Sequence, residues 1–536
     1  MNGGVADEEW FLTSAERGNP ATDLDRRHPG GVAWTAGNEV VPLVHGAAYF
    51  TRLLECVERM RSADVLFFTD WRGDPDELLD GPGTAVGAVF AQAAARGVVV
   101  KGLVWRSHLD PAFSQSENRH LGEEIEEAGG ECLLDMRVRA GGSHHQKFVV
   151  LRHPGRQELD VAFVGGIDLC HSRRDTADHH GDPQAQAMAD VYGPTPPWHD
   201  VQLEIRGPAV ADVEHVFRER WEDPAPLTRH PLHLLGALVR HEDRTAGTLP
   251  PRQPAPEPRG HQRVQVLRTY PFRRRGFRFA PAGERSVAHA YDKAVSRAHS
   301  LIYLEDQYLW SAEVVDCFAR ALHADPELHL VAVIPLHPDQ GGRLSVAPHM
   351  VGRGQALRRL RAAGGDRVAV YGIENHATTP VYVHAKVCVI DDVWCSVGSD
   401  NVNLRSWTHD SELSCAVLDE TPDMREPRVV DRFGDGARRF ARDLRLGLAR
   451  EHLDRADGDD EDLVDPRGAF LAFAESAAEL ERWHRGGRRG PRPPGRLRPY
   501  TLPRIGPWTR LWATPVYRVL YDPDGRPRSL RRRHDF

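Results

Sequence analysis

Short runs of apolar residues alternate with longer amphipathic segments along the chain, and the alternation occurs twice. In the first part, the spacing of apolar positions predicts helices over 47–60 and 87–96 and buried strands over 65–68 and 98–104. In the second part, it predicts helices over 287–298 and 312–322 and strands over 301–304 and 328–334. Strands that alternate with helices are typical of an α/β sheet with helices on both faces. We therefore expect an α/β fold.

A short motif repeats within this pattern. The first copy has His145 and Lys147 ahead of two apolar runs and a glycine-containing turn, and the second has His384 and Lys386 in the same arrangement. Residues two apart in a strand point to the same face, so each histidine is predicted to project from a strand together with its lysine. The repeat predicts two tandem α/β/α domains with pseudo-twofold symmetry and mixed sheets, whose two motifs meet in one cleft.

Changes in composition divide the chain further. We expect an N-terminal half over 1–221, a proline-rich linker over 222–262, a C-terminal half over 263–450, and an acidic linker with an arginine-rich tail over 451–536. The tail from Arg482 to Phe536 contains 15 arginines and 3 acidic residues. It is predicted to pack back onto an acidic body; the alternative is contact with a membrane through its Trp and Tyr side chains.

Composition narrows the class of protein. The chain has 536 residues and a net charge of -8, which argues against a protein that coats nucleic acid. It has no apolar run of about 18 residues that would span a bilayer, and Met1 to Trp10 does not resemble a secretory leader. The seven scattered cysteines suit a reducing compartment. We expect a cytoplasmic protein, with peripheral contact to membranes at most.

The repeated motif suits phosphoryl chemistry. Only four lysines occur among the 69 basic residues, and two of them are Lys147 and Lys386. An imidazole can attack phosphorus or donate a proton, and a compact ammonium can hold phosphoryl oxygens. The other histidines lack the spacing of metal ligands in sequence, so the sequence predicts no metal and no cofactor.

At these residues the chain resembles the phospholipase D superfamily, whose motif is His-x-Lys-x-x-x-x-Asp in each of two halves. The second copy matches it with His384, Lys386 and Asp391. The first copy has Arg152 where Asp is expected. Either Glu158 or Asp160 supplies the carboxylate in its place, or the first half has no such carboxylate. The segments Ile302 to Tyr308 and Pro197 to Asp200 are similar to elements of the branch that holds eukaryote-like and bacterial phospholipases D.

The resemblance implies roles for individual residues. His145 is expected to be the nucleophile and His384 the acid and then the base, although the repeat makes the two histidines hard to distinguish. Lys147, Lys386, Asn401 and Ser399 are expected to hold phosphate oxygens, with Asp168 in the place of Asn401. Glu412 is expected to orient an imidazole, and Asp175 to do so in the first half, with Asp178 as its competitor. Glu305 and Gln307 either line the site or make structural hydrogen bonds.

The function implied by the resemblance is hydrolysis of glycerophospholipids to phosphatidic acid and a head-group alcohol, or transfer to another alcohol. A single chain is expected to hold the whole site, and the oligomeric state stays open. The alternatives are phosphatidyl transfer as in cardiolipin synthesis, a nuclease or another phosphodiesterase, and a scaffold that lost activity along with the missing Asp. Nucleic acid is the less favoured partner because the body of the chain is acidic.

Overall fold

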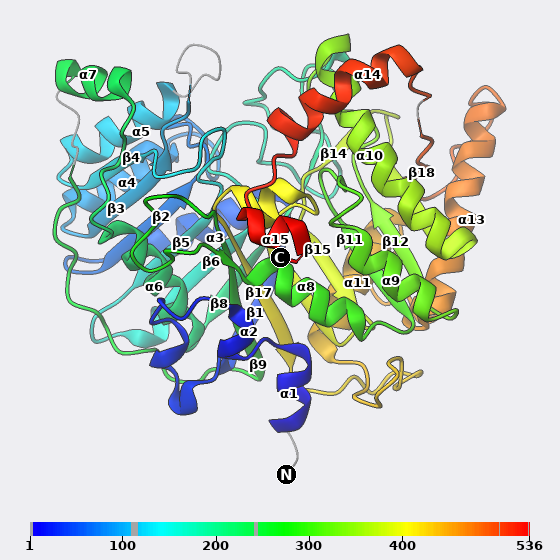
Figure 1. Ribbon diagram of the computed structural model, residues 1–536, viewed down its shortest axis with the longest axis horizontal. Helices are drawn as coiled ribbons and strands as arrows, with labels where there is room; N and C mark the ends of the chain where they lie inside the picture. The colour runs from blue at the N-terminus through cyan, green and yellow to red at the C-terminus, as the bar shows by residue number, and fades with distance from the viewer. Residues whose placement is uncertain (1–3, 109–115, 241–244, 503, 534) are drawn as a thin grey trace.

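The computed structural model describes residues 4–108, 116–240, 245–502, 504–533 and 535–536. Its first half, coloured blue to cyan, lies beside its second half, coloured green to orange (Figure 1). The two halves meet along β1 (Thr35–Val44) and β9 (Gln262–Tyr270), which pair antiparallel with Thr35 opposite Val264. Mixed sheet therefore continues from one half into the other.

In the first half the sheet order is β4-β3-β2-β5-β6-β8-β1. Strands β2, β3 and β4 are parallel, and the remaining neighbours in this order are antiparallel. The bounds are β2 (Val65–Asp70), β3 (Val99–Trp105), β4 (Glu131–Asp135), β5 (Phe148–Arg152), β6 (Val161–Gly165) and β8 (Val201–Arg206).

The second half has the corresponding order β13-β12-β11-β15-β16-β17-β9, with the same pattern of parallel and antiparallel neighbours. The bounds are β11 (Leu301–Glu305), β12 (His329–Val333), β13 (Val368–Glu374), β15 (Val387–Ile390), β16 (Trp394–Gly398) and β17 (Glu412–Asp419). The short strand β10 (Glu284–Arg285) pairs with β9. The seven strands of the first order thus correspond one to one to the seven of the second.

Helices cover both faces of each half. Alternate strand residues pack on opposite faces, as Leu66 and Phe68 face α3, α4 and α5 while Val65 and Phe67 face α6. In the second half, α8, α9 and α10 cover one face and α11 and α13 the other. The bounds are α3 (Gly46–Glu58), α4 (Val86–Ala95), α5 (Ser116–Glu127), α6 (Ala209–Trp221), α8 (Ser286–Ser296), α9 (Asp316–Ala324), α10 (Arg343–Gly364), α11 (Arg439–His452) and α13 (Pro466–Arg485).

Two contacts cross between the halves away from the central strands. Strand β7 (Trp198–His199) of the first half pairs parallel with β14 (Pro380–Val383) of the second, so that His199 lies opposite Val383. His144 forms an isolated parallel bridge with Ser411. Both crossings involve residues next to the repeated motif, and they therefore bring the two copies together.

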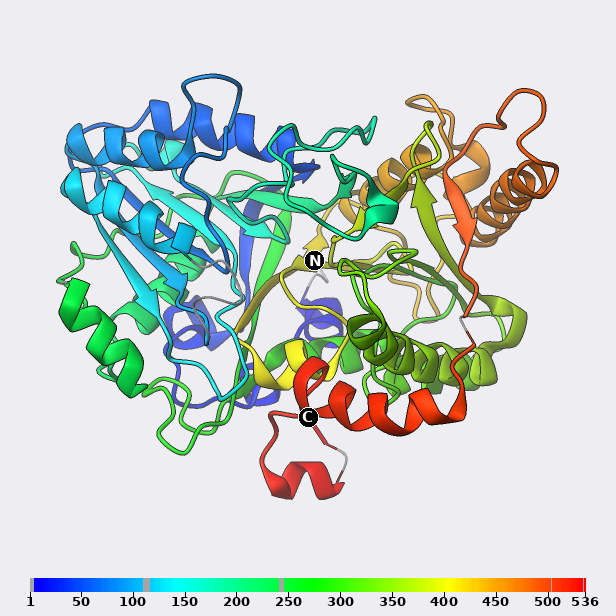
Figure 2. The same cartoon turned by 90° about the horizontal axis from the view of Figure 1, so that it is seen from above.

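The segments outside the repeat also fold against the body. The chain begins with α1 (Gly4–Trp10) and α2 (Ser14–Arg17), and the expected linker contains α7 (Pro231–Arg240). The acidic linker contains the short α12 (Glu461–Val464). The arginine-rich tail adds β18 (Leu497–Pro499) to the sheet beside β13, and continues into α14 (Pro507–Val516) and α15 (Arg528–Arg533). From above, the red α14 lies along the edge of the second half (Figure 2).

The α/β fold class is confirmed, and each helix and strand expected from periodicity occurs within a few residues of its expected bounds. One placement is wrong: the His-x-Lys residues precede β5 and β15 and do not lie within them. The backbone N–H groups of the two histidines donate to the other half of the chain, as described below. Among the described helices, none combines the length and apolarity needed to cross a bilayer.

Candidate active site

Two histidines, one from each half, line one cavity of about 370 Å³. His145 lies just before β5, and His384 lies between β14 and β15. The backbone N–H of His145 donates to the Ser411 carbonyl at 2.9 Å, and that of His384 donates to the His199 carbonyl at 2.8 Å. Each histidine is therefore tied by its backbone to the opposite half.

A carboxylate from the opposite half also contacts each imidazole. Glu412 Oε2 lies 2.8 Å from His145 Nδ1, and Asp200 Oδ2 lies 2.6 Å from His384 Nδ1. A carboxylate that accepts Nδ1–H selects the tautomer whose lone pair is on Nε2. Both rings are therefore held in the orientation that an attacking or proton-transferring imidazole requires.

Asp175, expected to orient the first histidine, lies elsewhere. Its carboxylate accepts the backbone N–H of Thr176 and of Trp198, both at 2.8 Å, so it fixes the segment between β6 and β7. The sequence analysis assigns no role to Asp200, although the segment Pro197 to Asp200 carries a family similarity. No local pattern pairs a carboxylate with either histidine, and in the structure each carboxylate comes from the half opposite to its histidine.

The two lysines have different environments. Lys147 Nζ lies 3.3 Å from Asp168 Oδ1 and donates to the His145 carbonyl at 3.1 Å. Lys386 Nζ lies 2.9 Å from His384 Nδ1. Asn401, at the position in the second half that Asp168 occupies in the first, carries no charge. Lys147 is therefore neutralised by an adjacent carboxylate, whereas Lys386 lacks such a counterpart at this position.

Burial and these pairings shift several pKa values. Burial favours the uncharged ammonium of Lys386 and lowers its pKa to about 8, against the attraction of Asp200. Burial, followed by the positive charges of Lys386 and Arg173, holds the pKa of His384 well below its usual value. Burial also raises the pKa of Asp200. Burial and these positive charges therefore favour the neutral form of the His384 ring.

Asp168 is ionised in this arrangement. Burial would raise its pKa, but Lys147, a hydrogen bond with Asp70 and the Arg173 guanidinium together hold the pKa below its usual value. Burial and the neighbouring Asp168 raise the pKa of Asp70, so that Asp70 keeps its proton. An ionised carboxylate repels phosphate oxygens. Asp168 lines the cavity, where its carboxylate pairs with Lys147, so its contact with phosphate stays a prediction.

Ser399 was expected to hold phosphate, but its hydroxyl donates to Glu412 Oε2 at 2.6 Å. It thus fixes the carboxylate that orients His145. Gly166 has the corresponding position in the first half, where a Cβ atom would lie 2.2 Å from Asp200 Oδ1. Because glycine has no side chain, the Asp200 carboxylate can lie close to the backbone of Gly166. Asn401 is 2% exposed, and its amide oxygen has no hydrogen-bond partner among the described residues.

Arg173 is a cavity residue that sequence reasoning missed. It lines the same cavity as the two histidines, and its guanidinium carbon lies 4.0 Å from the centroid of a Trp198 ring. The Trp198 side chain also packs on His384, with ring centroids 4.9 Å apart. The Nε atom of Arg173 has no hydrogen-bond partner among the described residues. Arg173 therefore adds a positive charge to the cavity, and its sequence context carries no motif that would have marked it.

Comparison with known proteins supports one family. The family model described as Phospholipase D matches residues 76–315. "Phospholipase D1" of Saccharomyces cerevisiae is 25% identical over 523 residues, which cover 82% of this chain and 30% of that protein. "Phospholipase D alpha 1" of Oryza sativa subsp. japonica is 25% identical over 459 residues, which cover 64% of this chain and 56% of that protein. The family-model match and these relatives support membership of the chain in the phospholipase D superfamily.

The chain spans about half the length of the rice relative and under a third of the yeast one. Among solved structures, it is similar to a phosphatidylserine synthase from Haemophilus influenzae Rd KW20. The TM-score is 0.49 and the identity 12%, with 72% of this chain and 84% of that chain covered.

Asp391, the third residue of the superfamily motif, accepts hydrogen bonds from the backbone. Its carboxylate accepts the backbone N–H groups of His299, Ser300 and Leu301 at 2.8 to 2.9 Å, at the start of β11. It does not line the cavity. In the first half, Arg152 at this position pairs with Asp160 at 2.9 Å. Asp160 therefore neutralises Arg152 and does not replace the missing motif carboxylate.

Glu305 and Gln307 have different surroundings. Gln307 lines the cavity and donates to the Tyr382 hydroxyl at 2.8 Å. Glu305 does not line it, and instead contacts His199 Nε2 at 2.6 Å and His452 Nε2 at 2.8 Å. The expected role as a lining residue therefore applies to Gln307 only, because the Glu305 side chain is enclosed by buried histidines.

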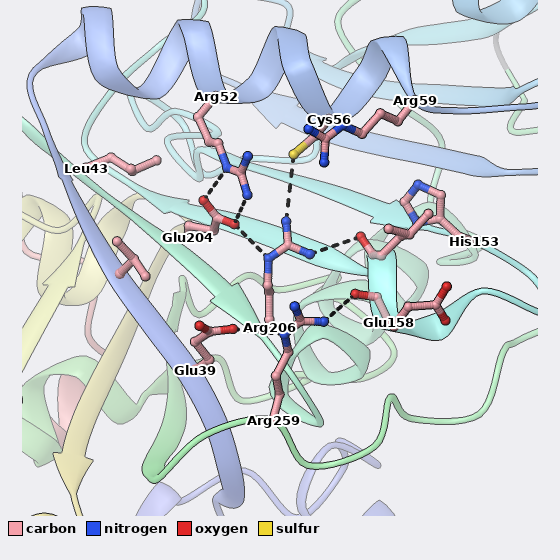
Figure 3. Close-up of a pocket in the computed structure, with 12 residues that line it drawn as sticks. Glu39, Leu43, Arg52, Cys56, Arg59, His153, Glu158, Glu204, Arg206 and Arg259 are labelled. Atoms are coloured by element: carbon pink, nitrogen blue, oxygen red, sulfur yellow. Dashed lines mark hydrogen bonds and ion pairs between the residues drawn. The ribbon is translucent and has the colours of Figure 1, made fainter.

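A second, larger cavity of about 510 Å³ lies between β1, α3 and β8 (Figure 3). Three of its four arginines are paired internally: Arg52 and Arg206 contact Glu204, and Arg259 contacts Glu39. It is lined by neither histidine of the repeated motif. The smaller cavity, where both motifs meet, is therefore the candidate active site.

We expect Asp391→Ala to lower the free energy of unfolding by about 2 to 4 kcal/mol, because three buried backbone N–H groups lose their side-chain acceptor. Asp391→Asn keeps one acceptor oxygen and should lose less. Denaturant unfolding of the full chain measures both, with the exposed Asp366→Ala as the control. A loss for Asp391→Ala no larger than that of the control would contradict this role.

Proposed function

We propose that the protein is a phospholipase D-type phosphodiesterase that hydrolyses glycerophospholipids to phosphatidic acid and a head-group alcohol. The observation that carries this proposal is the pair of histidines around one cavity, each oriented by a carboxylate of the opposite half. A buried lysine lies beside a lining residue in each half, Lys147 beside Asp168 and Lys386 beside His384. The similarity to yeast and rice phospholipases D supports a phospholipid as the substrate.

The reaction proceeds in two displacements. His145 Nε2 attacks phosphorus, and the P–N bond forms as the P–O bond to the head group breaks. His384 Nε2 gives its proton to the departing oxygen. Water then attacks phosphorus, His384 accepts its proton, and the P–N bond breaks to release phosphatidic acid. An alcohol in place of water yields a transferred phosphatidyl group by the same bond changes.

The two histidines differ in ways that support these roles. The His145 side chain is 15% exposed and that of His384 is 6% exposed, so His145 is the more accessible ring for attack. His384 is neutral in the empty site because burial and the adjacent Lys386 disfavour a second positive charge. A bound phosphodiester carries a negative charge that offsets Lys386. Substrate binding therefore favours the protonated His384 that the acid role requires.

The phosphate oxygens have several donors available. Lys147 and Lys386 supply ammonium groups from the two halves, and Arg173 supplies a guanidinium that lines the cavity. The Asn401 amide is a neutral donor in the second half. Preorganised donors of this kind stabilise the charge that develops on phosphorus oxygens during transfer.

The decisive experiment measures choline release from phosphatidylcholine vesicles by the full chain. We expect turnover by the wild type and a loss of about 1,000-fold or more in both His145→Ala and His384→Ala. His153→Ala is a matched control, since this buried histidine pairs with Asp160 away from the cavity. If the wild type cleaves single-stranded DNA and leaves every phospholipid intact, the protein is a nuclease and this proposal fails.

A trapping experiment assigns the two histidines. An activated phosphodiester with a p-nitrophenol leaving group needs little acid assistance, so His384→Ala should still form a phosphoenzyme, whereas His145→Ala should not. Acid quenching and peptide mapping locate the phosphohistidine. A phosphoenzyme in His145→Ala and none in His384→Ala would reverse the assignment while keeping the proposed reaction.

The cross-half carboxylates make a separate prediction. Asp200→Asn and Glu412→Gln keep the side-chain shape but favour the wrong imidazole tautomer, so each should lower kcat by about 100- to 10,000-fold. The melting temperature should change little in comparison. The exposed Glu158→Gln, a carboxylate that sequence reasoning considered, serves as the control and should keep full activity. Equal activities in all three variants would remove the orienting role.

The tail offers a surface for the proposed membrane substrate. Trp508 and Leu511 on α14 are 81% and 69% exposed, and Val519 and Leu520 in the next turn are 68% and 63% exposed. The exposed Arg510 and Arg518 lie among them. Beneath this face, α14 packs on a cluster that includes Tyr308, a cavity residue. Exposed Trp and Leu beside arginine suit the interface of an anionic bilayer.

The double change of Trp508→Ser and Leu511→Ser should weaken binding to anionic vesicles about tenfold or more, because buried apolar area is lost. Hydrolysis of a soluble short-chain phospholipid should stay unchanged. Vesicle cosedimentation measures the binding, and hydrolysis of the soluble substrate measures the activity. The control is Leu471→Ser on α13, where Leu471 is 52% exposed. Equal vesicle binding by both variants would show that this face does not contact the membrane.

A further inference from the structure

A cluster of histidines and glutamates lies behind the candidate active site. The donor atoms of four of its members lie within 4.8 Å of one another, and these are His45, His179, His199 and Glu451. They come from the β1–α3 junction, the segment between β6 and β7, strand β7, and the last turn of α11. All three histidines are at most 3% exposed, and the Glu451 side chain is 11% exposed. Four distant segments thus place nitrogen and oxygen donors in one buried volume.

The donors have nearly the spacing of a coordination shell. Glu451 Oε2 lies 2.9 Å from His45 Nε2, and Oε1 lies 3.1 Å from His179 Nε2 and 3.3 Å from His199 Nδ1. In a tetrahedral zinc site with bonds of about 2.0 to 2.1 Å, neighbouring ligand atoms are about 3.3 Å apart. The three rings meet at interplanar angles of 60° to 82°, so they approach the centre from different directions.

The outer nitrogens of two rings have partners that metal-bound histidines commonly have. His179 Nδ1 lies 3.0 Å from the Trp198 carbonyl oxygen, and His199 Nε2 lies 2.6 Å from Glu305 Oε2. A histidine ligand usually donates its other ring N–H to a carbonyl or a carboxylate, which directs the remaining lone pair at the metal. Glu305 is in turn held by His452, 2.8 Å away. The cluster therefore contains an inner set of donors and an outer set that orients it.

The backbone is also held in an uncommon conformation here. His45 and His179 have φ values of 70° and 53°, in the left-handed region that side chains other than glycine rarely adopt. Such conformations cost free energy and persist where surrounding structure enforces them, often at binding sites. The backbone N–H of His45 is held by the Asp200 carbonyl at 2.9 Å. Two of the three ring donors thus depend on strained backbone for their position.

We propose that His45, His179, His199 and Glu451 bind one Zn²⁺ ion. Three imidazoles and one carboxylate form the closed, four-ligand set that suits zinc in a structural site. None of the four lines the cavity of the candidate active site, so the ion is structural and not catalytic. It fixes the segment Trp198 to Asp200, whose last residue orients His384. This inference stands independently of the proposed substrate, and it revises the expectation of no metal, which rested on spacing along the sequence.

Elemental analysis of the full chain tests the site. Protein produced with zinc in the medium, freed of any affinity tag and purified without chelators, should carry about one zinc per chain. X-ray absorption at the zinc edge should report only nitrogen and oxygen ligands. His179→Asn and Glu451→Gln should each lose most of the zinc. His28→Asn is the matched control, because it removes another buried histidine, 2.8 Å from Asp212, and should keep the zinc.

A second measurement does not depend on the folding of variants. A strong chelator should lower the melting temperature of the wild type, and added Zn²⁺ should restore it, because an ion that binds only the folded state stabilises it. A stoichiometric metal other than zinc would overturn the assignment to zinc. Wild-type protein that holds no metal, takes up none on dialysis against micromolar Zn²⁺ and melts identically with chelator would show instead a hydrogen-bonded histidine cluster. That result would overturn the site and leave the proposed phosphodiesterase activity untouched.

Discussion

Each imidazole of the candidate site takes its orientation from a carboxylate of the opposite half, and the rest of the structure depends on this exchange. Asp200 reaches His384, and Glu412 reaches His145. In both cases the residue that precedes the carboxylate accepts the backbone N–H of the same histidine. Neither half can complete a histidine and carboxylate pair by itself. The relative position of the halves, set by the pairing of β1 with β9, is therefore a condition for the chemistry.

The site also has to hold many charges away from water. Burying a charge is costly unless a partner compensates it. In the first half, Asp168 compensates Lys147, and Asp70 keeps its proton beside Asp168. In the second half the neutral Asn401 replaces that carboxylate. Burial lowers the pKa of Lys386, and burial together with the Lys386 charge lowers the pKa of His384. Two halves of the same strand order thus provide different electrostatic environments, which is what two different roles for the histidines require.

Three consecutive residues connect the cavity to the buried histidine cluster. Trp198 packs on His384 and under Arg173, His199 belongs to the cluster, and Asp200 orients His384. Successive side chains of an extended segment point in opposite directions, so one short strand faces two polar systems. Displacement of this segment by even 1 Å would misplace the carboxylate at His384. The cluster around His199 is therefore positioned to affect catalysis without lining the cavity.

The sequence by itself determined the α/β class, the bounds of most strands and helices, and the repeated histidine and lysine pairs, because periodicity and local spacing carry that information. It also marked Glu412 as a carboxylate that orients an imidazole, without indicating which imidazole. Only the tertiary structure decided that Glu412 contacts His145, that Asp200 contacts His384, and that Ser399 holds Glu412. It also showed that Asp175 accepts backbone N–H groups of Thr176 and Trp198. The same holds for Arg173 in the cavity and for the cluster of His45, His179, His199 and Glu451. These groups lie far apart along the chain, and their contacts exist only because two sheets join and two segments cross between them, which no local pattern encodes.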